Sequence, residues 1–259
     1  MKTHKLISSD KTSWLMFGRD ENKPEKIIDT NQYLLRAGGK ALLMDPGGIE
    51  LFAPMLAAVL REVPLEEITD IFASHQDPDI ISSLGLWDQT LPNARLFSPW
   101  LWEGFIRHFG MNNITYMPIA DEGGTITLGS VEIEMVPAHY LHSSGNFHIY
   151  DPHAKVLMSG DVGAALEPVN APMKVEDFDE HIPKMKKFHQ RWMPSNEAKL
   201  DWINRVRKLD IDIMAPQHGR IFTGDNIQRF LDWFEELEVG TAIPRADTIE
   251  IEAELATAE

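Results

Sequence analysis

The sequence predicts an α/β protein in which two mixed β-sheets face each other and helices cover both outer faces, a four-layer αββα sandwich. Three observations support this prediction. The 259 residues, 43% of them hydrophobic, are enough to bury a full core. Apolar runs of strand length recur along the chain, with helical patterns between several of them. Strand pairs come first, strands alternating with helices follow, and this order then repeats.

Short apolar runs predict the strands, and apolar residues recurring on one face predict the helices. The predicted strands cover residues 33–36, 41–44, 68–73, 95–97, 125–128, 131–136, 147–150, 156–158 and 211–215. A first helix is expected over residues 51–60. Ser98 and Pro99 are of the residue types that cap and open a helix, which is expected to run through Phe109 and to end at Gly110.

The last third of the chain predicts two further helices. Ser195 is expected to cap the first of them. Their apolar stripes are Trp202, Ile203, Val206 and Leu209, followed by Ile227, Phe230, Leu231, Phe234 and Leu237. Residues 166–194, rich in Met, Lys, His and Pro, are expected to be an insertion that acts as a lid or a dimer contact. Residues 1–240 are expected to form a single domain, and residues 241–259 an acidic C-terminal extension.

Composition excludes several classes of function. The chain has 24 Lys and Arg against 40 Asp and Glu, a net charge of −16, which repels phosphate backbones and anionic lipids and excludes nucleic acid and membrane surfaces as partners. It has no Cys, which excludes disulfides, thiolate catalysis and iron–sulfur clusters. Residues 1–14 alternate polar with apolar residues and lack the apolar core of a signal peptide. A cytoplasmic protein is therefore expected.

Six residues with ligand-type side chains lie just after predicted strands. Residues 74–80, 137–146, 159–161 and 216–219 are polar segments that each follow an apolar run. Residues just past the strand ends gather along one edge of an open sheet, so side chains far apart in the chain can meet there. The candidate metal ligands are His75, Asp77, Asp79, His142, Asp161 and His218.

Each candidate also has an ordinary structural interpretation. Asp and Pro are common turn residues, so the segment from His75 to Asp79 is, on its own, better explained as a solvated turn. Asp161 after a glycine suits a helix N-cap, and His218 before Gly219 suits a simple loop. A lone His142 is more often a surface or core residue than a ligand. The recurrence of the same strand-to-loop context four times favours a shared metal site.

The order His-x-Asp-x-Asp, then His, then Asp, then His-Gly resembles the metallo-β-lactamase superfamily. Within it the diiron domain of the flavodiiron proteins is the more similar branch, because Asp77 stands where that branch has Glu and where hydrolases commonly have His. Residues 31–34 with Asp45, residues 91–95 and residues 215–221 are also similar to this branch. The resemblance therefore implies an αββα fold of metallo-β-lactamase type over residues 1–240.

The resemblance further implies two iron ions and assigns a ligand set to each. One iron would be bound by His75, Asp77 and His142. The other would be bound by Asp79 and His218, with Asp161 bridging both ions. The same donors also suit zinc and manganese.

One position departs from the pattern of this branch. Where it usually has a His ligand, directly after Asp79, the chain has Ile80. The second iron would therefore lack one protein nitrogen unless His139 or water replaces it. Tyr140 is hypothesised to donate a hydrogen bond to bound oxygen, with an ordinary half-buried tyrosine as the alternative. The tryptophans Trp87, Trp100, Trp102 and Trp192 would cover the site or an interface, or belong to the core.

The function implied by the resemblance is dioxygen binding as a peroxo-diiron species. Flavodiiron enzymes take electrons from a flavin on an appended flavodoxin domain, but only about twenty residues follow the last predicted helix here, so no flavin domain is expected. This arrangement resembles the oxygen-binding diiron proteins of bacterial chemotaxis and signalling. We therefore expect an oxygen or iron sensor that acts with a signalling protein and forms a homodimer. The alternatives are an oxygen or nitric oxide reductase with a separate flavin or rubredoxin-type donor, and a metal-dependent hydrolase.

Overall fold

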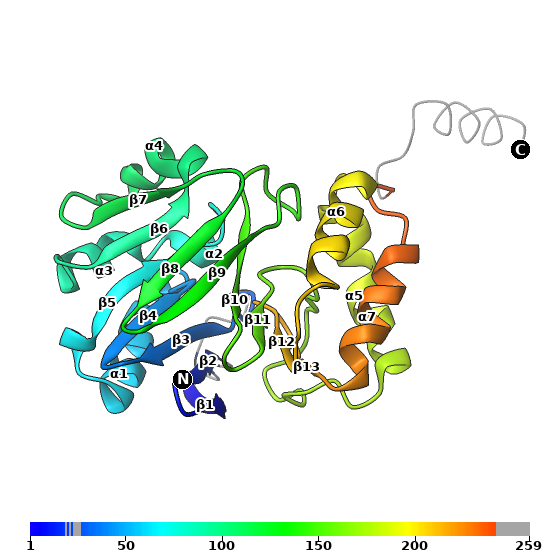
Figure 1. Ribbon diagram of the computed structural model, residues 1–259, viewed down its shortest axis with the longest axis horizontal. Coiled ribbons are helices and arrows are strands. Elements are labelled where there is room, and N and C mark those ends of the chain that lie inside the picture. Colours follow the sequence, from blue (N-terminus) through cyan, green and yellow to red (C-terminus); the bar gives the residue numbers. More distant parts are fainter. Residues whose placement is uncertain (19, 21, 23–26, 242–259) are drawn as a thin grey trace, which may run out of the picture.

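The first of two β-sheets is formed by the N-terminal half of the chain. In the computed structural model, which describes residues 1–18, 20, 22 and 27–241, this sheet has seven strands in sequence order (Figure 1). Neighbours from β1 to β4 are antiparallel, and those from β4 to β7 are parallel. The strands are β1 (Lys2–Ser8), β2 (Thr12–Gly18), β3 (Gln32–Ala37), β4 (Lys40–Met44), β5 (Ile68–Phe72), β6 (Arg95–Pro99) and β7 (Thr115–Ile119).

The second sheet follows directly in the chain and faces the first. Its strand order is β13-β12-β11-β10-β9-β8. Only β11 and β12 pair in parallel; the other neighbours are antiparallel. Its strands are β8 (Gly124–Leu128), β9 (Val131–Pro137), β10 (Phe147–Asp151), β11 (Val156–Met158), β12 (Ile213–Ala215) and β13 (Phe222–Thr223).

Helices cover the outer face of each sheet (Figure 1). On the first sheet these are α1 (Phe52–Glu62), α2 (Pro78–Ile81), α3 (Leu84–Thr90) and α4 (Glu103–Ile106). On the second sheet they are α5 (Phe178–Trp192), α6 (Asn196–Val206) and α7 (Asp225–Glu236). The predicted four-layer sandwich is thereby confirmed. None of the helices in the described residues is long and apolar enough to cross a membrane.

Strand β2 shows how the sequence builds these layers. Successive strand residues point to opposite faces, so a strand buried on both faces is apolar throughout. Trp14 and Met16 are buried between the two sheets, where Ile133 of the second sheet also lies. Leu15 and Phe17 are buried on the other face, against residues of α1 and α3. A third apolar layer joins the second sheet to α5, α6 and α7.

The structure contains strands that were not among those predicted. β1 has exposed or half-buried residues throughout, so it carries no continuous apolar run. β7 contains Pro118 and is only partly buried. Both lie at the edges of the first sheet and bury less apolar surface, which is why apolar runs alone do not reveal them. β2 is different: it is buried and contains the apolar run of residues 14–17, which the strand prediction left out.

The prediction that Ser98 and Pro99 begin a helix was wrong. Both residues belong to β6 and pair with β7. The Ser98 hydroxyl donates to the backbone oxygen of Ala73 at 3.1 Å and caps no helix. The segment that follows consists of short turns of helix, namely Trp100–Trp102, α4 and Arg107–Phe109. It ends as predicted at Gly110, whose φ of 85° suits glycine.

The predicted insertion at 166–194 contains the long helix α5. Asp177 caps it by accepting hydrogen bonds from the backbone N–H groups of Asp179 and Glu180, at 2.9 and 3.2 Å. The sequence did not predict this helix, because it contains Pro183 and is rich in polar residues. Ser195 caps α6 as predicted, accepting from the Ala198 N–H at 3.1 Å. Of the expected extension 241–259, residues 242–259 lie outside the described residues.

Candidate metal centre

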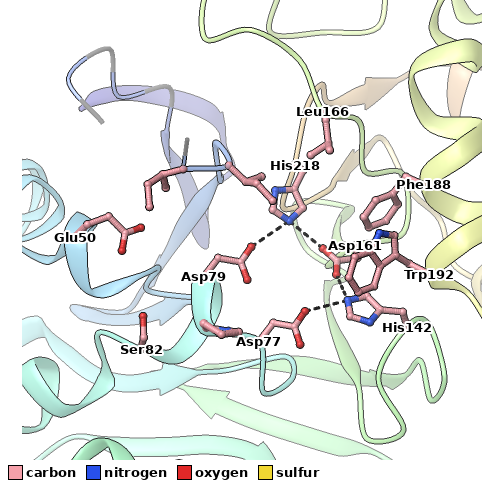
Figure 2. Close-up of a pocket in the computed structure, with 13 residues that line it drawn as sticks. Glu50, Asp77, Asp79, Ser82, His142, Asp161, Leu166, Phe188, Trp192 and His218 are labelled. Carbon is pink, nitrogen blue, oxygen red and sulfur yellow. Dashed lines mark ion pairs between the residues drawn. The ribbon is translucent and has the colours of Figure 1, made fainter. Parts of the chain in front are cut away.

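The six candidate ligands come together at one edge of the two sheets. His75, Asp77 and Asp79 follow β5 of the first sheet, and Asp79 lies in the first turn of α2. The other three follow β9, β11 and β12 of the second sheet, and are His142, Asp161 and His218 respectively. The site therefore lies where loops from both sheets meet (Figure 2).

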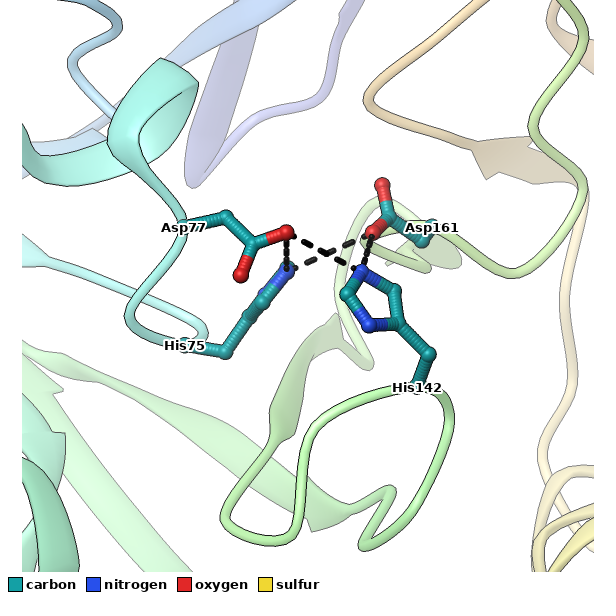
Figure 3. A group of neighbouring side chains, drawn as sticks. All are labelled: His75, Asp77, His142 and Asp161. Carbon is teal, nitrogen blue, oxygen red and sulfur yellow. Dashed lines mark ion pairs between the residues drawn. The ribbon is translucent and has the colours of Figure 1, made fainter. Parts of the chain in front are cut away.

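Four of these residues form one compact group (Figure 3). His75, Asp77, His142 and Asp161 each offer one ligand atom, and these atoms all lie within 4.8 Å of one another. The His142 Nε2 atom lies 2.8 Å from Asp161 Oδ2 and 3.2 Å from Asp77 Oδ2. The His75 Nε2 atom lies 3.3 and 3.7 Å from the same two oxygens.

A second group forms around the other carboxylate oxygen of Asp161. His218 Nε2 lies 3.3 Å from Asp161 Oδ1 and 3.4 Å from Asp79 Oδ2. Figure 2 shows Asp161 between His218 on one side and His142 on the other. Asp161 thus turns one oxygen to each group, which is the arrangement of a carboxylate that bridges two metal ions.

Hydrogen bonds outside the cluster orient two of the imidazoles. The Ser74 hydroxyl donates to Asp45 Oδ2 at 2.8 Å and lies 2.9 Å from His75 Nδ1. Because this hydroxyl has one proton and gives it to Asp45, it accepts from Nδ1–H, and Nε2 of His75 is left as the ligand atom. His218 is oriented in the same way, with Nδ1 2.9 Å from the backbone oxygen of Asp29. Partners of this kind are typical of metal-binding histidines.

The electrostatics of the cluster suit a bound cation. Burial disfavours protonation of the three imidazoles, but the carboxylates of Asp161 and Asp77 outweigh it. They raise the pKa of His75 to about 10 and that of His142 to about 9, and Asp161 likewise raises the pKa of His218 to about 9. Burial alone would raise the pKa of Asp161, yet its three histidine neighbours hold it well below the usual range. Positive charge is therefore strongly favoured here.

The donor set fits a metal pair in two respects. His75 Nε2 and Asp161 Oδ1 are buried and form no hydrogen bond within the described residues, although oppositely charged groups lie close to both. A buried polar atom without a hydrogen bond is costly unless an ion satisfies it. Three imidazoles and three carboxylates are also donors that suit iron, zinc and manganese.

A cavity of about 410 Å³ lies over the cluster. Asp77, Asp79, His142, Asp161 and His218 line it together with a largely apolar set of residues: Ile27, Ile28, Pro78, Leu166, Phe188 and Trp192. The Trp192 ring lies 5.2 Å from the ring of His142. Residues of the segment 166–194 thus form one wall of the site, and their action as a lid or a dimer contact stays a prediction.

The polar lining residues Glu50 and Ser82 and the aromatic Phe188 were not predicted from the sequence. They belong to helices or helical turns, where they look like ordinary polar or core positions. No sequence signal marks them, because their approach to the cluster depends on how α1, α2 and α5 are arranged. Of the four tryptophans considered, only Trp192 lines the cavity, whereas Trp87 is fully buried in the core.

Three residues raised by the sequence analysis lie away from the cluster. Ile80 is buried in the apolar layer between the first sheet and its helices. His139 does not replace the missing ligand: its Nε2 atom lies 2.8 Å from the backbone oxygen of Asp121, and its ring contacts Phe147. Tyr140 is half-exposed, and both His139 and Tyr140 line a different cavity. The structure therefore gives Tyr140 no contact with the proposed oxygen site.

Two facing sheets covered by helices, with a His/Asp cluster at one edge, define a protein of the metallo-β-lactamase fold. A family model described as "ODP family beta lactamase" matches residues 28–219. The chain belongs to this family, which confirms the resemblance found in the sequence.

Comparison with solved structures gives the same result. A structure described as the peroxy diiron species of the chemotaxis sensor ODP is 34% identical, with a TM-score of 0.82 over 97% of this chain and 100% of that chain. The apo state of the chemotaxis sensor ODP from T. denticola is also 34% identical, with a TM-score of 0.81 over 97% and 98%. The flavodiiron protein from Giardia intestinalis is 16% identical, with a TM-score of 0.78 over 90% of this chain and 59% of that chain, and shows the fold alone. A comparison with curated proteins found no match.

Proposed function

We propose that this chain is a non-haem diiron protein that binds dioxygen and serves as an oxygen or iron sensor in bacterial chemotaxis or signalling. One observation carries the proposal: the Asp161 carboxylate faces two separate His/Asp groups. This occurs in a chain that is 34% identical, over nearly its whole length, to a chemotaxis sensor described with a peroxy diiron species.

The residues of the chain would share the work as follows. His75, Asp77 and His142 would hold one iron, Asp79 and His218 would hold the other, and Asp161 would be shared by both. The chemistry that such a pair would supply is electron donation to dioxygen. The negatively charged carboxylates of Asp77, Asp79 and Asp161 would favour the more highly charged, oxidised ions.

The surroundings of the cluster support binding of a small neutral molecule. The apolar wall formed by Leu166, Phe188 and Trp192 favours dioxygen over polar solutes. Ile80 supplies no ligand, so the group at His218 has one imidazole where the group at His75 has two. An iron held by the His218 group would therefore have fewer protein ligands, and an added ligand could reach it from the cavity.

We further propose that residues 1–240 act as one metal-binding domain. The apolar layer between the sheets contains buried residues from β2 through β12, so the two sheets share a core. A signalling protein is proposed as the partner, and a head-to-tail homodimer as the assembly. Segment 241–259 is proposed to be outside the domain.

The test is dioxygen uptake by protein loaded with ferrous iron under anaerobic conditions. We expect two irons per chain, a new visible absorption band on exposure to air, and a single stoichiometric uptake of dioxygen. Sustained oxygen or nitric oxide consumption with an added reductase would instead indicate a reductase. Turnover of a model ester by zinc-loaded protein, without any optical change of the iron form in air, would contradict the proposal and indicate a hydrolase.

A further inference from the structure

A buried histidine on α5 contacts the loop that carries Asp161. His189 is fully buried, and its ring is surrounded by Phe188, Phe230, Trp233 and Phe234. Its Nδ1 atom lies 2.9 Å from the backbone oxygen of Met185, one turn earlier in the same helix. Its Nε2 atom accepts a hydrogen bond from the backbone N–H of Gly163 at 3.0 Å.

The two hydrogen bonds fix the state of this ring. A backbone oxygen can only accept, so Nδ1 carries the proton and Nε2 is the acceptor. Burial lowers the pKa of His189 to about 4, which keeps the imidazole neutral at physiological pH. His189 is therefore a permanent acceptor aimed at the Gly163 N–H.

Gly163 lies two residues after Asp161, in a tight turn. Val162 N–H donates to the Ser159 oxygen at 2.9 Å, and Ala164 N–H donates to the Asp161 oxygen at 3.0 Å. The turn needs glycine at 163, because φ is 95° and a Cβ would come within 3.1 Å of Met214 and Phe222. The Gly163 N–H points out of this turn and is held by His189, which ties the turn to α5.

α5 also contacts other loops of the candidate centre. Trp192, one turn after His189, packs against His142 at 5.2 Å between ring centroids. Lys184, earlier in the helix, pairs with Glu167 at 2.9 Å, and Glu167 pairs with Arg220 at 2.6 Å. Arg220 follows His218 by two residues. The helix thus contacts the loops of His142 and Asp161 directly and is linked to the His218 loop through Glu167.

We propose that His189 is a positioning residue of the metal centre: by accepting the Gly163 N–H it holds the Asp161 turn so that the carboxylate faces both His/Asp groups. This inference rests on the metal-binding part of the proposed function, but it does not depend on dioxygen chemistry. Loss of an outer hydrogen-bond partner of a metal site typically weakens metal binding by about 10–100-fold.

The test uses Co²⁺ as the probe, with affinity measured by competition with a chelator and geometry by the visible absorption bands of the bound ion. We expect His189→Leu to weaken Co²⁺ binding at least tenfold and to change these bands, because the acceptor is lost while the apolar bulk remains. His189→Gln, whose amide can place an oxygen near the position of Nε2, should restore wild-type binding and bands. If His189→Leu does not fold, His189→Asn replaces it in the test. Its shorter side chain cannot reach the Gly163 N–H, so it should weaken Co²⁺ binding and change the bands in the same way.

His181 supplies the matched control. It is a buried histidine on the same helix, its ring contacts Phe222, and neither of its nitrogens has a hydrogen-bond partner within the described residues. His181→Leu should leave Co²⁺ affinity and bands unchanged. Wild-type behaviour of both His189→Leu and His189→Asn, or an equal loss in His181→Leu, would overturn the inference. Failure of the iron form to bind dioxygen, with these Co²⁺ results intact, would overturn only the sensor function.

Discussion

The two oxygens of the Asp161 carboxylate face different neighbours, and this is the central feature of the site at the scale of single residues. Oδ2 lies against His75 and His142, and Oδ1 lies against His218. The pKa of Asp161 is held low by these imidazoles, so the carboxylate is ionised and can bind metal on both sides.

Replacing Asp161 by Asn should therefore affect both groups at once. The amide has one acceptor oxygen and an N–H₂ group that repels cations. We expect metal affinity to fall by more than about 100-fold, beyond the loss usual for outer partners, and two-metal stoichiometry to disappear. Metal analysis and chelator competition measure this, with the exposed Asp10→Asn variant as the control. Retention of two tightly bound ions would disprove the bridging role.

Ser74 links Asp45 to His75 and is expected to tune the site without binding metal. Ser74→Ala removes the hydrogen bonds to both residues. We expect a roughly 10–100-fold loss of metal affinity and a loss of about 1–3 kcal/mol in the free energy of unfolding, read by chelator competition and urea denaturation. Ser98→Ala, which removes a buried hydrogen bond to a backbone oxygen, should lower stability but leave metal affinity unchanged. Equal effects of the two variants on metal binding would contradict this role.

At the scale of elements, the site depends on helix α5 as well as on the strand ends. The strands deliver the ligands, because each candidate lies just after a strand or in the first turn that follows one. α5 supplies the apolar wall and holds the Asp161 turn, yet no ligand comes from it. Its place over the second sheet is maintained by α6 and α7, with which it shares an apolar layer.

Capping of α6 gives a prediction at this scale. Ser195 accepts a hydrogen bond from the Ala198 N–H, which satisfies one of the free donors of the first turn. Ser195→Ala should lower the free energy of unfolding by about 1 kcal/mol, and Ser195→Asp should retain the wild-type value. Urea denaturation followed by circular dichroism measures both. An unchanged free energy of unfolding in Ser195→Ala would show that this cap does not contribute to stability.

At the scale of the whole molecule, the candidate centre joins the two sheets. Three ligands come from loops of the first sheet and three from loops of the second, so ions bound between them would cross-link both halves of the fold. Unfolding would destroy the site. Metal binding should therefore raise the free energy of unfolding, by about 2.7 kcal/mol at a ligand concentration of 100 times Kd.

This stabilisation should increase with pH. The folded pKa values of His75, His142 and His218 lie above the ordinary value of 6.5, so their protonation stabilises the metal-free fold fully below about pH 6.5. That contribution is lost as the pH rises through the pKa values of these histidines in the folded state. Over the same range, protons compete less with the metal for the histidine nitrogens. The gain in Tm on adding Zn²⁺ should be greater at about pH 8.5 than at about pH 6.5. An equal or smaller gain at the higher pH would contradict these pKa shifts.

Much of the fold was predictable because apolar patterning is local. Interior strands buried on both faces, such as β4 and β11, appear as unbroken apolar runs. The edge strand β1 does not, and α5 contains Pro183 and many charged residues. The turn at Ser98 was misjudged because a serine followed by proline suits either a helix start or the end of a parallel strand, and pairing with β7 decides between them.

The sequence by itself determined the fold class, the absence of thiol chemistry and the six candidate ligands, because residue type and position relative to apolar runs are encoded locally. Only the tertiary structure decided how those residues are grouped. The division of the Asp161 oxygens between two clusters, the separation of His139 from the site and the contact of His189 with Gly163 all join segments far apart in the chain. Such contacts depend on how sheets and helices pack in three dimensions, which local patterns do not specify.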